Sequence, residues 1–375
     1  MRVFIWVQHL RGIGHIMRAL AIARALQNAG ATVRVATGNT PPTVTNTAGI
    51  DVIELPPCRA SDDTIQTLVD ARGEPINDTW WEERADALAA TFHAFQPDIL
   101  VTECYPFGRR PFRRELQPLI DAMHKKNGLV VASLRDILQR VSRPKKAKWM
   151  VERASEFHKF CVHGHRELAT LESALPTEDV AFENVIYTGF VHDRPVSEAT
   201  EESGEIIVSV GGGAMGETLL SVVPDAIVEA PQKWRWRVLH GALAPTDIVA
   251  QLRAIDRQTV TIETARPDFP ALLNSAACSV SLCGYNTAMD VLISGVPSVM
   301  VPFDDAGQTE QNQRASALAK LGRVTMIEPA SLTPERLVAA IKDAKEKPIP
   351  DLSFQFDGAE RTAKTLFDLF ERHHG

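Results

Sequence analysis

The stretch "VFIWVQHLRGIGHIMRALAIARAL" (residues 3–26) joins an apolar run, a glycine turn and an amphipathic helical pattern in immediate succession. The same order returns in "EIIVSVGGGAMGETLL" (205–220), which again predicts a strand, a glycine turn and a helix. Short β-rich runs alternate with helical patterns after each of these stretches, which is typical of parallel sheets covered on both faces. We therefore expect an α/β protein with two Rossmann-like, doubly wound domains.

A polar stretch separates the two halves. Residues 192–204 read "HDRPVSEATEESG" and offer little to bury, so we predict a linker at 193–204. The first domain would then span 1–192 and the second 205–358, and the final 359–375 form an amphipathic helix.

Composition narrows the class of protein. The chain has 375 residues and a formal net charge of −7, which argues against nucleic acid as a partner. Its five cysteines are scattered and form no C-x-x-C pair. This pattern is typical of proteins in a reducing compartment and provides no cysteine ligands with the spacing of a zinc site. Neither a signal peptide nor an apolar segment of the ~18 residues needed for a membrane span is apparent, so we expect a cytoplasmic protein.

The first glycine turn does not fit a dinucleotide fingerprint. Gly12-x-Gly14 begins one, but the place of the third glycine holds Met17, and no acidic residue ends the next strand. The turn still lets a ligand approach the backbone beside His15, at a helix start where the dipole favours the neutral imidazole that a general base needs. Arg18 lies one turn later and suits an anion. A purely structural role for this histidine and arginine remains an alternative.

The second half carries stronger signals for a phosphate group. Three glycines at 211–213 lie between a strand and a helix, where backbone amides suit a diphosphate. In "GYNTAMD" (284–290), Gly284 ends a strand, and Asn286 and Thr287 open a helix where they would reach phosphate oxygens. Asp290, one turn further, suits two ribose hydroxyls.

A third polar group follows the next strand. The loop "FDDAGQTEQNQ" (303–313) presents Glu310, Gln311 and Asn312 at a helix start. Such side chains can hydrogen-bond several hydroxyls of a sugar, and they discriminate well because an unpaired buried polar group is costly.

These motifs together resemble the MurG-like group of GT-B glycosyltransferases. The shared pattern is G-x-G-H at 12–15, the glycine loop at 211–214, G-x-x-T-x-x-D at 284–290, and E-Q at 310–311. The resemblance implies two domains that face each other across a cleft, with the acceptor on the first and the nucleotide-sugar donor on the second. It also implies that the helix 359–375 packs back on the first domain.

The resemblance assigns donor contacts residue by residue. The diphosphate would be held by Gly211, Gly212, Gly213, Ala214, Gly284, Asn286 and Thr287. The ribose would bind Asp290, the base would lie near Ala265, Arg266 and Phe269, and the sugar would contact Glu310, Gln311 and Asn312. The turn of Gly12 and Gly14, with Arg18, would line the cleft.

Three residues compete as the base that deprotonates the acceptor. His15 matches the glycine-turn histidine that faces the reacting sugar. Glu103 and Asp136 each follow a predicted strand, and a helix cap or a surface ion pair is the alternative for both.

The reaction that the resemblance implies is an inverting one. Retaining members of the fold often carry a second acid eight positions before the ribose acid, and here that position is Leu282. A single in-line displacement, with amides stabilising the departing diphosphate, is therefore expected. "FDD" (303–305) lacks the spacer of a D-x-D metal motif, so we expect no essential metal and no cofactor besides the UDP-sugar.

The substrates and partners are predicted only by class. The donor is expected to be a UDP-sugar carrying GlcNAc or another hexose, and the acceptor a small molecule or a lipid-linked sugar. Two clusters of basic residues, the basic islands at 108–115 and 143–149, leave peripheral contact with the inner face of the membrane as a possibility. We expect a monomer or a homodimer. A nucleotide-sugar hydrolase, a 2-epimerase and a non-catalytic nucleotide-sugar binding protein are the alternatives.

Overall fold

The computed structural model describes residues 1–10, 13–42, 45–61, 67–176, 181–192, 203–211, 216–303 and 309–375. The chain divides into two compact units. Unit 1 comprises Met1–Asp193 and Phe354–Gly375, and unit 2 comprises Arg194–Ser353. Each contains one parallel sheet with helices on both faces, so the predicted α/β class with two parallel-sheet domains is confirmed.

Unit 1 is built on a sheet whose described strands run in the order β3-β2-β1-β6-β7-β8-β9, all parallel. The strands are β1 (Arg2–Val7), β2 (Thr32–Thr37), β3 (Asp51–Glu54), β6 (Ile99–Glu103), β7 (Leu129–Arg135), β8 (Lys159–His163) and β9 (Val185–Tyr187). A separate antiparallel pair, β4 (Arg59–Ala60) and β5 (Leu68–Val69), was not predicted.

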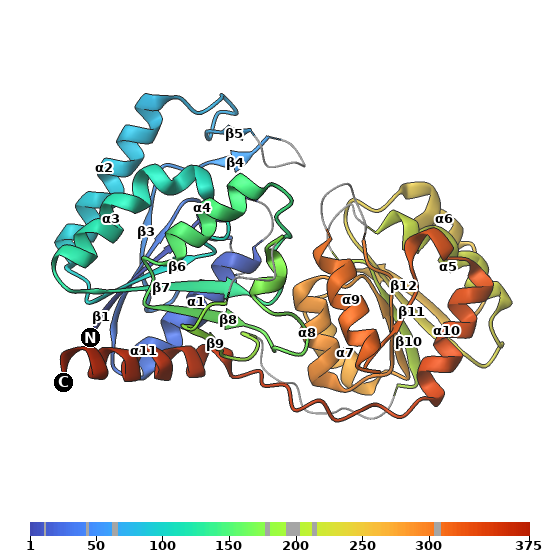
Figure 1. Ribbon diagram of the computed structural model, residues 1–375. Coiled ribbons are helices and arrows are strands. Elements are labelled where there is room, and N and C mark those ends of the chain that lie inside the picture. The colour runs from blue at the N-terminus through green and yellow to red at the C-terminus, as the bar shows by residue number, and fades with distance from the viewer. Residues whose placement is uncertain are drawn as a thin grey trace. The chain divides into compact units, whose positions relative to one another are not determined.

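Helices cover both faces of this sheet (Figure 1). They are α1 (Gly14–Asn28), α2 (Asp78–Phe95), α3 (Arg113–Lys125), α4 (Pro144–Ala154) and α11 (Gly358–His374), with short 3-10 turns η1 (Arg110–Phe112) and η2 (Glu172–Ala174). One apolar core contains side chains of α2, α3 and α4, and the other contains those of α1 and α11. Strand β1 supplies both cores, because its alternate residues point to opposite faces and Val3 to Val7 are all buried.

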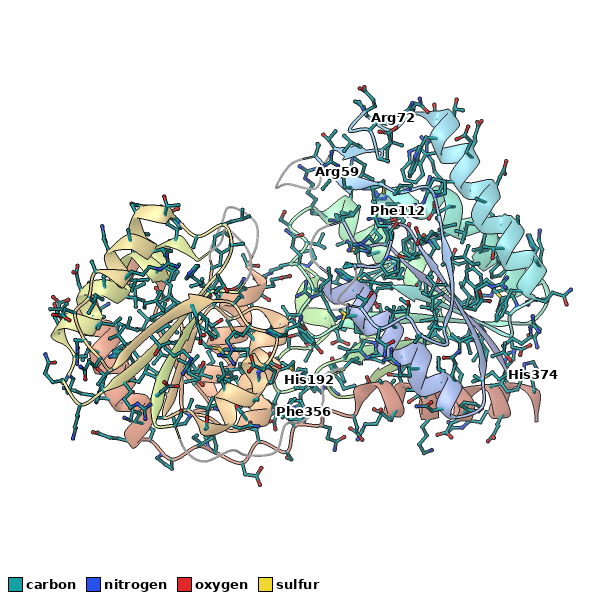
Figure 2. All side chains as sticks on the ribbon, turned by 180° about the vertical axis from the view of Figure 1, so that it is seen from behind. Arg59, Arg72, Phe112, His192, Phe356 and His374 are labelled. Carbon is teal, nitrogen blue, oxygen red and sulfur yellow. The ribbon has the colours of Figure 1, made fainter. Side chains whose placement is uncertain are left out.

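The last helix packs on the first domain, as predicted, and it does so against α1. Ala359, Ala363 and Leu366 of α11 share a core with α1. The return to unit 1 begins earlier than the predicted boundary at 358, because the segment from Phe354 is already part of unit 1. The backbone N–H of Phe190 donates to Gln355 O at 2.7 Å, and the Phe190 ring packs against Phe354 and Phe356. Figure 2 shows Phe356 beside His192, and His374 at the other end of α11.

Unit 2 repeats the architecture with the strand order β12-β11-β10-β13-β14-β15, again all parallel among the described residues. The strands are β10 (Glu205–Ser209), β11 (Arg235–His240), β12 (Val260–Thr264), β13 (Cys278–Ser281), β14 (Ser298–Met300) and β15 (Thr325–Met326). The helices are α5 (Glu217–Glu229), α6 (Thr246–Arg253), α7 (Phe269–Ser275), α8 (Tyr285–Ser294), α9 (Glu310–Lys320) and α10 (Pro334–Glu346), with the 3-10 turn η3 (Pro329–Ser331).

Most of the predicted linker, 193–202, lies outside the described residues. Its last two residues belong to unit 2, because the backbone N–H groups of Ser203 and Gly204 both donate to Ser275 O, at 2.9 and 3.2 Å. Within the described part of the chain, no helix combines the length and the apolar character that crossing a membrane requires.

Candidate active site

Three predicted residues of unit 1 meet at the carboxyl ends of its strands. His15 lies in the first turn of α1, directly after β1, and Glu103 is the last residue of β6. His15 Nδ1 is 2.9 Å from Glu103 Oε1, and the Arg18 guanidinium donates to the same oxygen. The structure therefore joins two of the three proposed bases in one contact, which the sequence did not predict.

The charges in this cluster are well defined. Burial alone would raise the pKa of Glu103, but the charge of Arg18 and the hydrogen bond from His15 outweigh it and hold that pKa well below its usual range. Burial and the charge of Arg109 lower the pKa of His15 to about 3, against the opposing effect of Glu103. At neutral pH the cluster thus holds an ionised Glu103 and a neutral His15.

This charge state selects one tautomer of His15. An ionised carboxylate only accepts hydrogen bonds, so the imidazole must carry its proton on Nδ1 and leave Nε2 unprotonated. Arg18 Nη2 also lies 3.2 Å from Nδ1, but we assign its donated proton to the carboxylate, which is the stronger acceptor. Side-chain exposure is 15% for His15 and 1% for Glu103, so the imidazole is the more accessible group.

A further chain of polar groups extends behind Glu103. Ser133 Oγ of β7 lies 2.5 Å from Glu103 Oε2 and 2.9 Å from His163 Nε2, at the end of β8. His163 Nδ1 lies 2.8 Å from the hydroxyl of Thr188, which follows β9. Sequence reasoning missed all three, because an isolated Ser, His or Thr in an apolar strand gives no signal until the strand register is known.

Cys104 completes a set of potential metal ligands with His15 and Glu103. Their ligand atoms lie within 4.8 Å of one another, and Cys104 Sγ is 3.5 Å from both His15 Nδ1 and Glu103 Oε1. However, burial and the charge of Glu103 raise the pKa of the Cys104 thiol to about 11. A metal ion would need the thiolate and would have to displace the Arg18 guanidinium, so these residues do not suit one as they stand.

Arg109 is a second arginine beside the histidine. It adopts a left-handed conformation (φ 59°) in the turn before η1, and its Nε donates to Gln8 O at 2.7 Å. Its positive charge disfavours the imidazolium form of His15. This residue was part of a predicted basic island and had not been connected with the histidine.

Asp136, the third proposed base, follows the neighbouring strand β7. Its side chain is fully buried, and Arg135 Nε lies 3.9 Å from Asp136 Oδ1. Gly164, directly after β8, packs against it so closely that a Cβ there would lie 2.9 Å from both Cα and Cβ of Asp136. The position of Asp136 is thus fixed by a close backbone contact.

The glycine turn of unit 1 is described only from Ile13 onward, and Gly12 lies outside the described residues. At Gly14 an added Cβ would meet no described atom within 4 Å. Glycine is therefore not required there by packing within unit 1, and the space beside it is open.

In unit 2, helix α8 begins with the predicted phosphate-binding residues. Gly284 precedes it in an extended conformation. Asn286 is exposed and Thr287 is half-buried in that turn, while Asp290 is 3% exposed one turn later. The amides of a helix N-terminus carry a partial positive charge, which suits an anionic group.

The predicted glycine loop at 211–214 is described only at its first residue. Gly211 has φ 72°, a left-handed conformation that favours glycine, whereas Gly212, Gly213 and Ala214 lie outside the described residues.

Gln311 connects two loops at the carboxyl ends of the unit 2 strands. Its Oε1 accepts from the backbone N–H of Cys283, after β13, at 3.1 Å, and from that of Phe303, after β14, at 3.2 Å. Arg314, fully buried, donates from Nη1 to Cys283 O at 2.8 Å. The amide of Gln311 is thereby oriented with its NH₂ group available as a donor. Glu310 is the first residue of α9, and Asn312 Oδ1 accepts from Ser316 Oγ at 3.3 Å.

The three residues proposed to hold the base follow β12. The backbone N–H of Ala265 donates to His240 O at 2.8 Å. The Arg266 guanidinium is ion-paired with Asp268 at 2.6 Å and with Glu263 at 3.3 Å, and Phe269 is only 8% exposed. The side chains of Arg266 and Phe269 are thus committed to ion pairs and to packing, which leaves the backbone as the polar surface of this loop.

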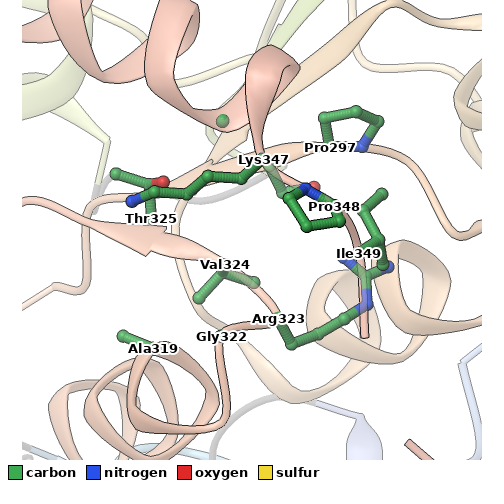
Figure 3. Close-up of a pocket in the computed structure, with 11 residues that line it drawn as sticks. Pro297, Ala319, Gly322, Arg323, Val324, Thr325, Lys347, Pro348 and Ile349 are labelled. Atoms are coloured by element: carbon green, nitrogen blue, oxygen red, sulfur yellow. The ribbon is translucent and has the colours of Figure 1, made fainter. Parts of the chain in front are cut away.

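A separate pocket of unit 2 lies at the opposite end of its sheet (Figure 3). It is lined by Pro297 and Ser298, where β14 begins, by Arg323 before β15, and by Lys347 after α10. Arg323 donates to Val291 O and Val296 O, at 2.5 and 3.2 Å. Ligands of such sheets bind beyond the carboxyl ends, so we do not place the donor here.

The chain is similar in sequence and in fold to known proteins. Residues 206–353 match the glycosyltransferase family 28 C-terminal domain. A protein of Methylorubrum populi named UDP-N-acetylglucosamine--N-acetylmuramyl-(pentapeptide) pyrophosphoryl-undecaprenol N-acetylglucosamine transferase is 32% identical over 173 residues, or 45% of this chain and 46% of that protein. A Methylorubrum extorquens protein of the same name is 34% identical over 162 residues, or 42% and 43% of the two chains. The chain thus aligns with about half the length of these curated relatives.

Solved structures match the whole chain in fold. MurG of Acinetobacter baumannii has a TM-score of 0.62 at 14% identity, covering 99% of this chain and 100% of that one. The glycosyltransferase of kitacinnamycin has a TM-score of 0.63 at 16% identity, covering 100% and 96%. These matches confirm the predicted resemblance: the chain has the fold of the GT-B glycosyltransferases and is MurG-like, with a second unit that matches the family 28 C-terminal domain.

Proposed function

We propose that this protein is an inverting glycosyltransferase that moves a sugar from a UDP-sugar to an acceptor hydroxyl without an essential metal. The observation that carries the proposal is the pair formed by a neutral, partly exposed His15 and an ionised, buried Glu103 at the strand ends of unit 1. It occurs in a chain whose second unit matches a glycosyltransferase domain.

In the proposed reaction, His15 is the general base. The acceptor oxygen attacks the anomeric carbon while the bond from that carbon to the diphosphate breaks, and UDP leaves with the electron pair. Nε2 of His15 takes the hydroxyl proton, and Glu103 stabilises the imidazolium that forms. Glu103 and Asp136 have almost no exposed side chain, which favours the histidine among the three candidates.

The donor would bind at the carboxyl ends of the unit 2 strands. The first turn of α8, which follows Gly284, would hold the diphosphate, Asp290 the ribose, and Gln311 a sugar hydroxyl through its NH₂ group. Amides that already point at the leaving diphosphate stabilise its growing charge without reorganisation. Leu282, where retaining enzymes of this fold often carry an acid, supports inversion.

The identities of sugar and acceptor are proposed from the relatives. Their printed name specifies UDP-N-acetylglucosamine and a pyrophosphoryl-undecaprenol acceptor. We propose GlcNAc as the first donor sugar to test and a lipid-linked diphosphate as the first acceptor. In unit 1 the Arg110 guanidinium packs over the Trp149 ring at 5.3 Å, so the two predicted basic islands adjoin, which suits an anionic acceptor or membrane surface.

The deciding experiment incubates the protein with UDP-GlcNAc and other UDP-sugars, with and without acceptors, and measures UDP release. Release that depends on an acceptor, with inverted anomeric configuration in the product and no loss in EDTA, supports the proposal. Fast stoichiometric release of UDP without an acceptor would identify a hydrolase instead. Release of UDP coupled to inversion at C2 of the sugar would identify a 2-epimerase. Binding of UDP-sugars without turnover would indicate a sensor.

A further inference from the structure

Behind the His15–Glu103 pair, three buried polar side chains continue across the sheet. Each of four neighbouring strands contributes one residue to this chain. Glu103 lies in β6, Ser133 in β7 and His163 in β8, and Thr188 directly follows β9; the four strands are adjacent in that order in the sheet. We propose that Ser133, His163 and Thr188 are positioning residues that hold Glu103 in place and so select the tautomer of His15 that can accept a proton. This inference rests on the proposed function, since it assigns a role to residues behind the proposed base.

The direction of every hydrogen bond in this chain follows from the ionised Glu103. The carboxylate can only accept, so Ser133 must donate its single hydroxyl proton to Oε2 across 2.5 Å. Ser133 Oγ then has to accept from His163, which places that imidazole's proton on Nε2. His163 Nδ1 becomes an acceptor, and the Thr188 hydroxyl donates to it across 2.8 Å.

His163 is neutral in this chain. Burial lowers its pKa to about 3, and the charge of Arg18 acts in the same direction. A neutral imidazole offers one donor and one acceptor, which is the combination that a directed chain requires at this position. An imidazolium would offer two donors, and Thr188 would then have to turn its hydroxyl proton away.

The burial of these groups distinguishes a positioning role from ordinary core packing. Ser133, His163 and Thr188 are 2%, 0% and 1% exposed. Apolar side chains would fill the same space without the desolvation cost of two hydroxyls and an imidazole. A fully satisfied polar chain instead fixes one arrangement of its members, and this one ends at the carboxylate that contacts the proposed base.

Loss of the chain should act on His15 through its tautomer. Without the Ser133 hydroxyl, Oε2 of Glu103 loses its donor, and the contacts of Arg18 and His15 at Oε1 orient the carboxylate less tightly against Nδ1. His15 could then carry its proton on Nε2, where it cannot take a proton from the acceptor. The group that touches substrate is unchanged, so the affinity for donor and acceptor should persist while the rate falls.

The kinetic test uses matched pairs of variants in the full-length protein. Ser133→Ala and Thr188→Val remove the hydroxyls, and Ser133→Thr and Thr188→Ser keep them. We expect Ser133→Ala to lower kcat by about 10-fold to 100-fold, below the full contribution of a general base, with KM within about twofold. Thr188→Val should have a smaller effect in the same direction, and both conservative variants should recover most of the loss. The control Thr362→Val removes a buried hydroxyl of α11 that donates to Gly358 O at 2.6 Å, and it should affect stability but not kcat.

The second test needs no turnover. Long-range ¹H–¹⁵N spectra of protein labelled with ¹⁵N-histidine report which ring nitrogen of His15 and of His163 carries the proton. We expect Nδ1–H for His15 and Nε2–H for His163 in the native protein, and mixed tautomers of His15 in Ser133→Ala. If His15 keeps a single Nδ1–H tautomer in Ser133→Ala and kcat is unchanged, the three residues only stabilise the fold and the inference is wrong. If the native protein transfers no sugar, the proposed function fails while the spectra still decide the positioning role.

Discussion

Arg18 places its guanidinium directly on the carboxylate of Glu103, and the two side chains are only 4% and 1% exposed. The pair keeps Glu103 ionised inside unit 1, and this ionised state determines both the tautomer of His15 and the direction of the chain through Ser133.

Removing the positive partner should therefore destabilise the fold. In Arg18→Met the buried carboxylate loses its compensating charge, and we expect the free energy of unfolding to fall by about 3–5 kcal/mol. Urea denaturation at neutral pH measures this. The double variant Arg18→Met/Glu103→Gln, which removes both charges, should recover part of the loss. An equal loss in the single and double variants would contradict the assignment of an ionised Glu103.

Replacement of the proposed base should separate rate from binding. We expect His15→Ala to lower kcat by about 10²–10⁴-fold, because the acceptor hydroxyl loses its proton acceptor, while the Kd for UDP changes by less than about threefold. Asn28→Ala, at the exposed end of the same helix, serves as control. A large change in UDP affinity with an unaltered rate would move His15 from catalysis to donor binding.

Asp290 should contribute to nucleotide affinity. Its carboxylate is proposed to accept from two ribose hydroxyls, so Asp290→Ala is expected to raise the Kd for UDP by about 10-fold or more, measured by calorimetry. Asp225→Ala removes an exposed carboxylate from α5 in the same unit and should leave the Kd unchanged. Equal affinities in native protein and Asp290→Ala would refute the ribose assignment.

Two glycines should respond in opposite ways to an added methyl group. At Gly284 a Cβ meets no described atom within 4 Å, and the backbone is ordinary (φ −62°). Gly284→Ala should therefore fold normally and weaken UDP binding by occupying the ligand's space. At Gly164 a Cβ would collide with Asp136, so Gly164→Ala should cost about 1–3 kcal/mol of stability. Thermal denaturation and UDP titration of both variants test this. Destabilisation of Gly284→Ala without loss of affinity would show that glycine is needed there for packing.

Stability should fall in mild acid. The pKa values of His15 and His163 are about 3 in the folded protein, against ~6.5 in an unfolded chain. Between these values the unfolded state binds protons that the folded state does not, so the free energy of unfolding decreases as the pH falls from ~6.5. Each histidine contributes at most about 1.4 kcal/mol per pH unit. The stabilisation from ionised Glu103 remains between pH ~6.5 and pH ~4.3 and is lost progressively below the unfolded value of ~4.3, where it adds to the loss from the histidines.

Urea titrations of the native protein and of His15→Gln at about pH 7 and about pH 5 measure this effect. The variant should lose less stability between the two pH values than the native protein. His93→Gln, which changes an exposed histidine of α2, should match the native slope. Parallel slopes for native protein and His15→Gln would contradict the lowered pKa.

Much of the fold could be predicted from local pattern alone. The runs that became β1 and β7 are long and apolar enough to indicate buried parallel strands. The helix predicted to open at Asn286 and Thr287 is α8 in the structure. The boundary at 358 was misplaced because Phe354 to Phe356 have no regular secondary structure and are held by contacts with Phe190, far away in sequence.

The residues of the candidate site could be singled out one by one from the sequence, but their arrangement could not be predicted. His15, Arg18 and Glu103 could each be singled out, because each follows a strand or a glycine turn. Their convergence depends on β1 and β6 being neighbours in the sheet, which local sequence does not reveal. His163 had no signal at all, since a histidine within "KFCVHG" reads as an ordinary strand end. The glycine loop at 212–214 and the remaining donor contacts stay predictions.

The packing of α11 on α1 also bears on how the protein is made. A ribosome delivers α1 early and α11 only after all of unit 2 has been synthesised. Unit 2 is continuous in sequence and can fold as soon as it emerges, whereas the Ala359, Ala363 and Leu366 face that completes one core of unit 1 arrives last. Until α11 is synthesised, the apolar surface of α1 is exposed and can bind chaperones. Unit 2 should therefore complete its folding before unit 1, which is the reverse of their order along the chain.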